Sequence, residues 1–168
     1  MKDNIILIGM PGCGKSTIGV LLAKNLAYGF LDSDLVIQEQ SGRKLQDMID
    51  EMGPEAFSAF EDAVNATLIP HNTVIATGGS AVYGTRAMEH FREIGTVVYL
   101  NASYETIEKR IRNFATRGIV IPEGQTFRDV YNERTALYEK YADITVDVDA
   151  DKADIWDVVE AITAKLKD

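Results

Sequence analysis

The sequence has almost no cysteine and no long apolar run, and both absences limit what the protein can be. A single cysteine, Cys13, excludes an intramolecular disulfide and a cysteine-rich metal site. No apolar run reaches the roughly 18 residues of a candidate transmembrane helix. The first predicted strand follows the N-terminus too closely to leave room for a signal peptide. We therefore expect a cytoplasmic protein.

Positive charge is also scarce. The chain has 17 lysines and arginines against 26 aspartates and glutamates, for a formal net charge of −9 at pH 7. Such a balance disfavours nucleic acid and acidic lipid surfaces, so neither is expected as a partner. An anionic small-molecule substrate would need a local cationic pocket. Residues 1–168 show no linker and no internal repeat, which predicts a single domain, and no exposed apolar stripe is evident, which favours a monomer.

What the sequence does contain is a phosphate-binding loop. Ile5 to Ile8 are apolar without polar alternation, which predicts a strand buried on both faces. The pattern Gly9-x-x-x-x-Gly14-Lys15-Ser16 follows directly, and residues 18–26 then predict a helix. The glycines let backbone N–H groups surround an anion, and the positive end of the helix faces the same point. This arrangement predicts binding of a nucleoside triphosphate.

Individual residues of this loop have expected roles. Lys15 supplies positive charge to the β- and γ-phosphates, and Ser16 offers a hydroxyl to Mg²⁺. Cys13 is interpreted as a small residue that fits the loop. The residues expected to contact the nucleotide here are Gly9, Pro11, Gly12, Cys13, Gly14, Lys15, Ser16 and Thr17.

Short apolar runs alternate with helical segments along the rest of the chain. Strands are predicted at 29–31, 74–77, 96–100 and 144–148, and helices at 35–40, 45–52, 55–68, 86–92, 126–140 and 153–166, with a further helix after Ser103. The alternation predicts a three-layer α/β/α fold with helices on both faces of a parallel sheet. Ligands bind at the carboxyl ends of strands in such folds. The polar clusters at 9–17, 32–34 and 78–80 lie at these ends and are expected to converge.

Two carboxylates, Asp32 and Asp34, follow one of these strands. If the backbone stays extended, both project to the same side. One could then hold a metal and the other accept a proton from an attacking hydroxyl. The alternative is that both are solvated turn residues that cap the next helix.

Residues 113–125 lose helical periodicity and contain glycine and proline, which predicts a mobile loop. Arg117 lies where a lid would close over phosphates, so it is a candidate cation for phosphoryl transfer. Arg110 before the loop and Arg134 after it are further candidates. Arg112 is interpreted as a solvated residue.

The order of these landmarks resembles the shikimate kinase family over nearly the whole chain. After the phosphate loop come Phe30-Leu31-Asp32-Ser33-Asp34, Gly53-x-x-x-Phe57-x-x-x-Glu61, Gly78-Gly79-Ser80 and Arg134-x-x-Leu137-Tyr138-x-x-x-Ala142. The resemblance implies the nucleoside-monophosphate-kinase arrangement of the P-loop fold, with a five-stranded parallel sheet in the order 2-3-1-4-5. It also implies substrate-binding helices at about 33–69 and a lid at about 113–125.

The implied reaction is ATP- and Mg²⁺-dependent transfer of the γ-phosphate to the 3-hydroxyl of shikimate, in aromatic amino acid biosynthesis. The resemblance assigns the metal to Ser16 and Asp32 and the adenine to stacking on Arg110. The implied substrate contacts are Asp34, Glu61, Gly78, Gly79, Ser80 and Arg134, with Arg134 on the substrate carboxylate. The implied catalytic residues are Lys15, Asp34 as base, and Arg117 in the lid.

The sequence departs from the family pattern at two places. Ser58 follows Phe57 where the family has an arginine that also holds the substrate carboxylate, a contact worth about 1.5–3 kcal/mol. Glu61 thereby loses the arginine that it would face. The lid reads Arg117-Gly118-Ile119-Val120 in place of Arg-Pro-Leu-Leu and lacks the stiffness of proline.

Three hypotheses follow. The first is a shikimate kinase that tolerates Ser58. The second is a related kinase for another polyol or sugar acid, of which gluconate kinases are an example. The third is a nucleotide-binding module without turnover, which the presence of both Asp32 and Asp34 beside Arg117 disfavours.

Overall fold

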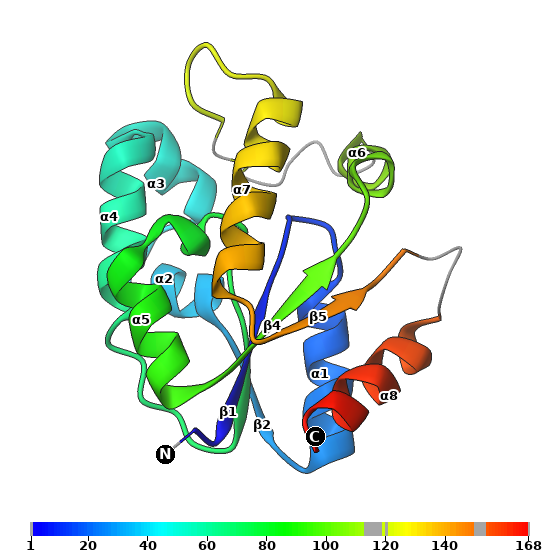
Figure 1. Cartoon of the computed structure of the whole chain (residues 1–168). Helices are drawn as coiled ribbons and strands as arrows, with labels where there is room; N and C mark the ends of the chain where they lie inside the picture. The colour runs from blue at the N-terminus through cyan, green and yellow to red at the C-terminus, as the bar shows by residue number, and fades with distance from the viewer. Residues whose placement is uncertain (1, 113–118, 120, 150–153, 168) are drawn as a thin grey trace.

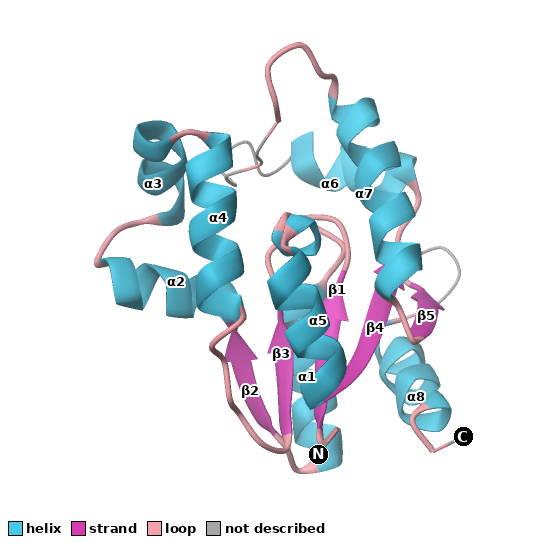
Figure 2. Ribbon diagram, turned by 60° about the vertical axis from the view of Figure 1, so that its left-hand side comes forward, coloured by secondary structure: helices cyan, strands magenta, loops and turns pink. Residues whose placement is uncertain are grey.

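A five-stranded parallel sheet lies between two layers of helices (Figures 1 and 2). The computed structural model describes residues 2–112, 119, 121–149 and 154–167. The strands are β1 (Asn4–Ile8), β2 (Gly29–Asp32), β3 (Thr73–Ala76), β4 (Gly95–Asn101) and β5 (Ile144–Asp147). Their order is β2-β3-β1-β4-β5, and every neighbouring pair is parallel. The predicted fold class and strand order are confirmed.

The helices of the described chain are α1 (Lys15–Leu26), α2 (Ser33–Ser41), α3 (Leu45–Met52), α4 (Pro54–Asn65), α5 (Thr85–Ile94), α6 (Tyr104–Arg112), α7 (Phe127–Tyr141) and α8 (Ile155–Lys165), with a short 3₁₀ turn η1 (Ala81–Tyr83). Helices α1 and α8 pack together on one face of the sheet, and α5 and α7 lie on the other (Figures 1 and 2). None of the helices described is long and apolar enough to cross a membrane.

The central strand β1 is buried on both faces, as its unbroken apolar run predicts. Ile5, Ile6, Leu7 and Ile8 are each at most 4 % exposed. Full burial of such a side chain contributes about 1.5–3 kcal/mol, so this strand anchors the main core. The phosphate loop therefore starts from one of the most deeply buried strands of the molecule.

Helices α2, α3 and α4 form a lobe beside the carboxyl ends of the strands (Figure 2). They share a small apolar core of their own, made by Ile37, Met48, Phe57 and Val64. Helix α4 ends earlier than predicted, at Asn65, because Thr67 closes the last turn: its backbone N–H and its hydroxyl both donate to the Val64 carbonyl. The lobe carries Asp34 and Glu61 to one side of the site.

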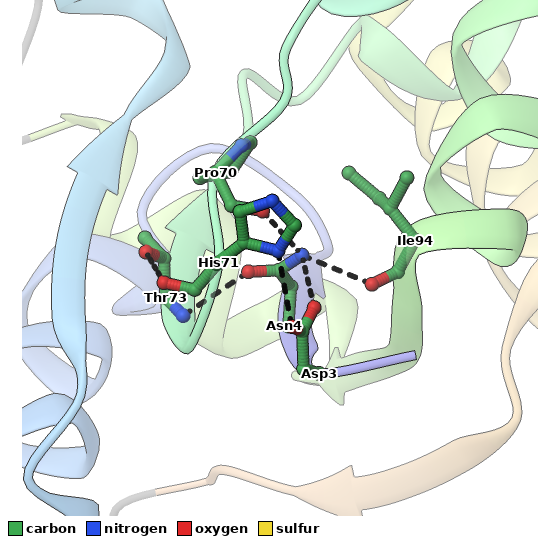
Figure 3. Close-up of polar contacts among 6 residues, drawn as sticks. All are labelled: Asp3, Asn4, Pro70, His71, Thr73 and Ile94. Carbon is green, nitrogen blue, oxygen red and sulfur yellow. Dashed lines mark hydrogen bonds and ion pairs between the residues drawn. The ribbon is translucent and has the colours of Figure 1, made fainter. Parts of the chain in front are cut away.

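At the amino ends of the strands, the buried amide of Asn4, the first residue of β1, joins the segments that lead into β3 and β4 (Figure 3). Asn4 is 2 % exposed, and its Nδ2 donates to the carbonyls of Pro70 at 2.8 Å and Ile94 at 3.0 Å. Its Oδ1 accepts from the Thr73 backbone N–H at 3.1 Å. These bonds satisfy backbone groups at the starts of β3 and β4, next to β1.

We expect Asn4→Ala to lower the free energy of unfolding by about 3 kcal/mol, because it leaves buried backbone groups without partners. Asp3→Ala is the matched control. It removes a contact to Asn4 Nδ2 and a pair with the exposed His71, so its expected cost is below about 1 kcal/mol. Urea denaturation followed by circular dichroism measures both. Equal losses in the two variants would contradict a special role for the buried amide.

Candidate active site

The phosphate loop connects β1 to α1 in a conformation that requires glycine. Gly9 has φ +149°, and a Cβ placed on it would lie 2.7 Å from the Leu100 carbonyl oxygen. The Cys13 backbone N–H donates to the Met10 carbonyl at 3.1 Å, which closes the turn. Helix α1 then begins at Lys15, three residues before the predicted start, so the end of the helix lies within the loop motif itself.

Lys15 is only 8 % exposed and lies across the loop. Its Nζ donates to the carbonyls of Gly9 at 2.6 Å and Met10 at 2.9 Å. The Cys13 side chain is 1 % exposed, with its Sγ 3.7 Å from Lys15 Nζ. The loop thus holds one buried positive charge, and the thiol points into the protein.

A cavity of about 340 Å³ lies at the carboxyl ends of β1, β2 and β3. Its lining residues are Pro11, Gly12, Lys15, Ser16, Asp32, Asp34, Gln38, Leu45, Thr77, Gly78 and Gly79. Residues from all three predicted polar clusters are among them, so the expected convergence is confirmed. Gln38, Leu45 and Thr77 were not predicted. Gln38 lies four residues after Asp34 on α2, a spacing that places both on one helix face.

Asp32 connects the phosphate loop to the start of α2. Its Oδ2 accepts from Ser16 Oγ at 3.0 Å, and its Oδ1 accepts from the Asp34 backbone N–H at 3.0 Å. It is therefore the N-cap of α2, and the backbone does not stay extended through Asp34, which belongs to the helix. The condition of an extended backbone is therefore not met, and Asp32 caps the next helix as the alternative predicted. Both carboxylates nevertheless line the same cavity.

Ser16 Oγ and Asp32 Oδ2 are the hard oxygens that could hold Mg²⁺. Within the described chain, no group of three or more histidine, cysteine or acidic side chains could hold a metal. Mg²⁺ usually takes only one or two protein ligands and completes its shell with phosphate and water oxygens. A site with this donor pair therefore fits Mg²⁺ bound together with a nucleotide.

Asp34 is a half-buried residue of α2 that lines the cavity, and its Oδ1 atom is buried. Burial, and then the charge of Asp32, raise its pKa to about 6, although Lys15 acts in the other direction. Its Oδ1 has no hydrogen-bond partner in the part of the chain that the structure describes. A carboxylate with a pKa near the working pH can accept a proton efficiently.

Glu61 is a second buried carboxyl, 2 % exposed, on α4. It accepts from Ser80 Oγ at 2.7 Å. A Cβ placed on Gly78 would lie 2.7 Å from Asp34 Oδ1 and 2.9 Å from Glu61 Oε2, so the two carboxyls flank the same backbone. Burial raises the pKa of Glu61 to about 7, with a smaller contribution from the charge of Asp34.

The turn at 78–80 lies between the phosphate loop and α7. A Cβ on Gly79 would lie 2.6 Å from Pro11 Cδ and 3.2 Å from Arg134 Nη1. Arg134 is 1 % exposed, and its guanidinium carbon lies 5.4 Å from the centre of the Tyr83 ring. The backbone N–H groups of residues 78–80 donate to no acceptor within the described chain, which leaves them available to a ligand.

The remaining predicted residues lie at the edge of the site or outside the description. Arg110 Nη1 donates to the Gly12 carbonyl at 3.0 Å, so this side chain reaches the phosphate loop. Thr17 is exposed on the first turn of α1. Arg117, the lid arginine, lies outside the described residues, as does the side chain of Arg112.

The raised pKa of Glu61 predicts how stability depends on pH. A carboxyl whose pKa is higher in the folded state than the usual 4.5 destabilises the fold progressively as the pH rises through that interval. We expect Glu61→Gln to remove this loss and to be more stable than the wild type by about 2 kcal/mol at pH 8, with a smaller difference at pH 5. Glu55→Gln, at an exposed position on the same helix, is the control, and denaturation curves at several pH values make the comparison. A constant difference across this range would contradict the buried, uncompensated carboxyl.

Comparisons with known proteins agree with this geometry. The family model described as shikimate kinase matches residues 11–167. The shikimate kinase of Thiobacillus denitrificans is 38 % identical over 149 residues, covering 87 % of this chain and 81 % of that protein. That of Chlorobium chlorochromatii is 36 % identical over 174 residues, covering 97 % and 90 %. The solved shikimate kinase of Acinetobacter baumannii, in complex with shikimate, superimposes with a TM-score of 0.86 at 29 % identity, covering 99 % of this chain and 93 % of that one. The chain belongs to the shikimate kinase family.

Proposed function

We propose that this protein is a shikimate kinase, which uses ATP and Mg²⁺ to phosphorylate a hydroxyl of shikimate. One observation carries the proposal: a single cavity is lined by the phosphate loop with Lys15, by the Ser16–Asp32 oxygen pair, and by the carboxyl of Asp34. Phosphoryl transfer requires these elements, because it depends on positioning and charge neutralisation more than on covalent chemistry. The net charge of −9 disfavours a nucleic-acid partner. We also propose that the protein is cytoplasmic and acts as a monomer.

On the nucleotide side, the loop and Lys15 bind the β- and γ-phosphates. Ser16 and Asp32 would hold the metal ion, which would supply neutralising charge to the phosphate oxygens. Arg110, whose Nη1 donates to the Gly12 carbonyl, is proposed to stack on the adenine, and this contact with the phosphate loop supports the assignment. Arg117 is proposed as the lid arginine that completes the charge around the γ-phosphate.

On the acceptor side, Asp34 is the base. The acceptor oxygen attacks the γ-phosphorus, the bond to the β-phosphate oxygen of ADP breaks, and the hydroxyl proton moves to the Asp34 carboxylate. Arg134 binds the acceptor carboxylate, since its buried guanidinium lies against the turn at 78–80. The N–H groups of this turn bind acceptor oxygens, and Glu61 holds Ser80 in place.

We expect Asp34→Asn to lower kcat for shikimate by at least about 100-fold, because the amide cannot accept the proton. The Kd for ATP should stay within about twofold, since Lys15 and the loop are unchanged. A coupled ADP-release assay and calorimetric ATP titration measure the two quantities. Asp47→Asn, at an exposed position on α3, removes the same charge away from the cavity and serves as control.

Two results would contradict different parts of this proposal. Wild-type turnover by Asp34→Asn would exclude Asp34 as the base. No turnover of shikimate by the wild-type protein, with ATP binding intact, would exclude shikimate as the acceptor.

A second candidate function is phosphorylation of a polyol that lacks the carboxylate. The observation that favours it is a cavity of about 760 Å³ between α4, η1 and α7, which includes Ser58 in its lining. The charged residues that line it are all acidic: Glu55, Asp62, Glu123 and Glu133. A carboxylate is disfavoured next to these groups, whereas a neutral hydroxylated ring is not.

Ser58→Arg discriminates between the two acceptors. An arginine here would add a carboxylate contact worth about 1.5–3 kcal/mol, so the KM for shikimate should fall at least about tenfold. Ala56→Arg, which places the same charge at an exposed position on α4, is the control and should leave this KM unchanged. A carboxylate-free cyclic polyol that the wild type phosphorylates faster than shikimate, and that Ser58→Arg no longer uses, would establish the second function. An unchanged KM for shikimate in Ser58→Arg would show that position 58 does not face the acceptor.

A further inference from the structure

Tyr138 is a buried residue of α7 whose hydroxyl reaches the turn at residues 78–80 (the acceptor turn). The side chain is 1 % exposed, and its hydroxyl donates to the Gly79 carbonyl at 2.5 Å. The same oxygen lies 3.9 Å from Met10 Sδ in the phosphate loop. Burial raises the pKa of the Tyr138 hydroxyl, which therefore keeps its proton and remains a donor. Tyr138 is not among the lining residues of either cavity described above, so its route to a ligand in them is through the turn.

The geometry of the peptide bond extends the effect of this contact by one residue. The Gly79 carbonyl and the Ser80 N–H belong to one planar trans peptide and point in opposite directions. A bond that holds the carbonyl toward Tyr138 therefore holds the Ser80 N–H away from it. Ser80 lines the larger cavity, and its N–H donates to no acceptor within the described chain.

The same turn is held on its other side by the phosphate loop. Pro11 packs so closely on Gly79 that a Cβ there would lie 2.6 Å from Pro11 Cδ. Tyr138 lies one helical turn after Arg134, whose Nη1 would be 3.2 Å from the same Cβ. Gly79 is thus the point at which the phosphate loop, the acceptor turn and α7 meet.

We propose that Tyr138 is a positioning residue whose hydroxyl, through the Gly79–Ser80 peptide, directs the Ser80 N–H toward the acceptor. The proposal rests on the proposed function, because it assumes an acceptor bound at this turn. Without the hydroxyl, the Gly79 carbonyl loses the donor that the described chain gives it, and the peptide rotates to find another. A rotated peptide turns the carbonyl oxygen toward the oxygens of the acceptor, which repels them.

Tyr138→Phe removes one oxygen atom, and Tyr99→Phe is its matched control. Tyr99 is also 1 % exposed, its ring lies 5.2 Å from that of Tyr138, and its hydroxyl donates to Asn101 Oδ1 at 3.0 Å. Both variants lose a buried hydroxyl from the same aromatic pair, so similar decreases in melting temperature are expected. Only Tyr138→Phe should lower kcat/KM for the acceptor, by about tenfold, while the KM for ATP stays within about twofold.

An equal kcat/KM for the acceptor in the two variants would overturn the proposal, as would an equal loss for ATP and acceptor in Tyr138→Phe. A second measurement works without turnover. In ¹⁵N NMR spectra of the ligand-free protein, the amide resonances of Gly79 and Ser80 should shift or broaden in Tyr138→Phe and stay in place in Tyr99→Phe. Unchanged resonances in both variants would overturn the fixed-peptide step. If Tyr138→Phe changes these resonances but the wild-type protein is inactive on shikimate, the proposed acceptor is rejected and the positioning role of Tyr138 is kept.

Discussion

Buried positive charge is the constraint on which this site depends, because a chain of net charge −9 must bind a polyanion. Lys15 is 8 % exposed and Arg134 is 1 % exposed, so the two cations lie inside the protein at one edge of the sheet. Charges interact more strongly there than in water, and they are less screened by salt. The fold keeps Lys15 buried by giving its ammonium two backbone carbonyls, and the loop glycines make those carbonyls available. The electrostatic potential at the site is therefore set by these buried cations and not by the net charge of the chain.

This chain has Ser58 where the family pattern has an arginine, and the raised pKa of Glu61 is relevant to that difference. Its buried carboxyl has the Ser80 hydroxyl as hydrogen-bond donor, and Arg134 lowers its pKa less than burial raises it. Near neutral pH the carboxyl is therefore protonated in a large fraction of molecules. A neutral Glu61 adds no negative charge beside an anionic acceptor, which offsets part of what the missing arginine would have contributed. Under the proposed function, Ser58 removes one carboxylate contact, and the protonation of Glu61 limits the negative charge that an anionic acceptor would meet.

Patterns of neighbouring residues made part of this structure predictable. The apolar run of β1 and the glycine spacing after it indicated the phosphate loop, and the family resemblance supplied the strand order. The conformation of Asp34 was not predictable from spacing, because Asp32 satisfies a backbone N–H of α2 and so starts the helix one residue later, at Ser33. The contact between Tyr138 and Gly79 was not predictable either, because the two residues are 59 positions apart in the sequence. Sequence periodicity reports which face of an element is buried, and not which atom it meets there.

In the proposed mechanism, helix α7 couples acceptor binding to the geometry of phosphoryl transfer. Its N-terminus is fixed by a capping box in which Thr126 and Asp129 exchange hydrogen bonds. Along this rigid rod, Arg134 and Tyr138 are one turn apart, so a displacement that moves the guanidinium also moves the donor to the Gly79 carbonyl. Because Pro11 packs on Gly79, the displacement is resisted by the phosphate loop. In the proposed mechanism, an acceptor bound by Arg134 would therefore be held in a fixed relation to the bound phosphates. Positioning of this kind is the main contribution that a protein makes to phosphoryl transfer.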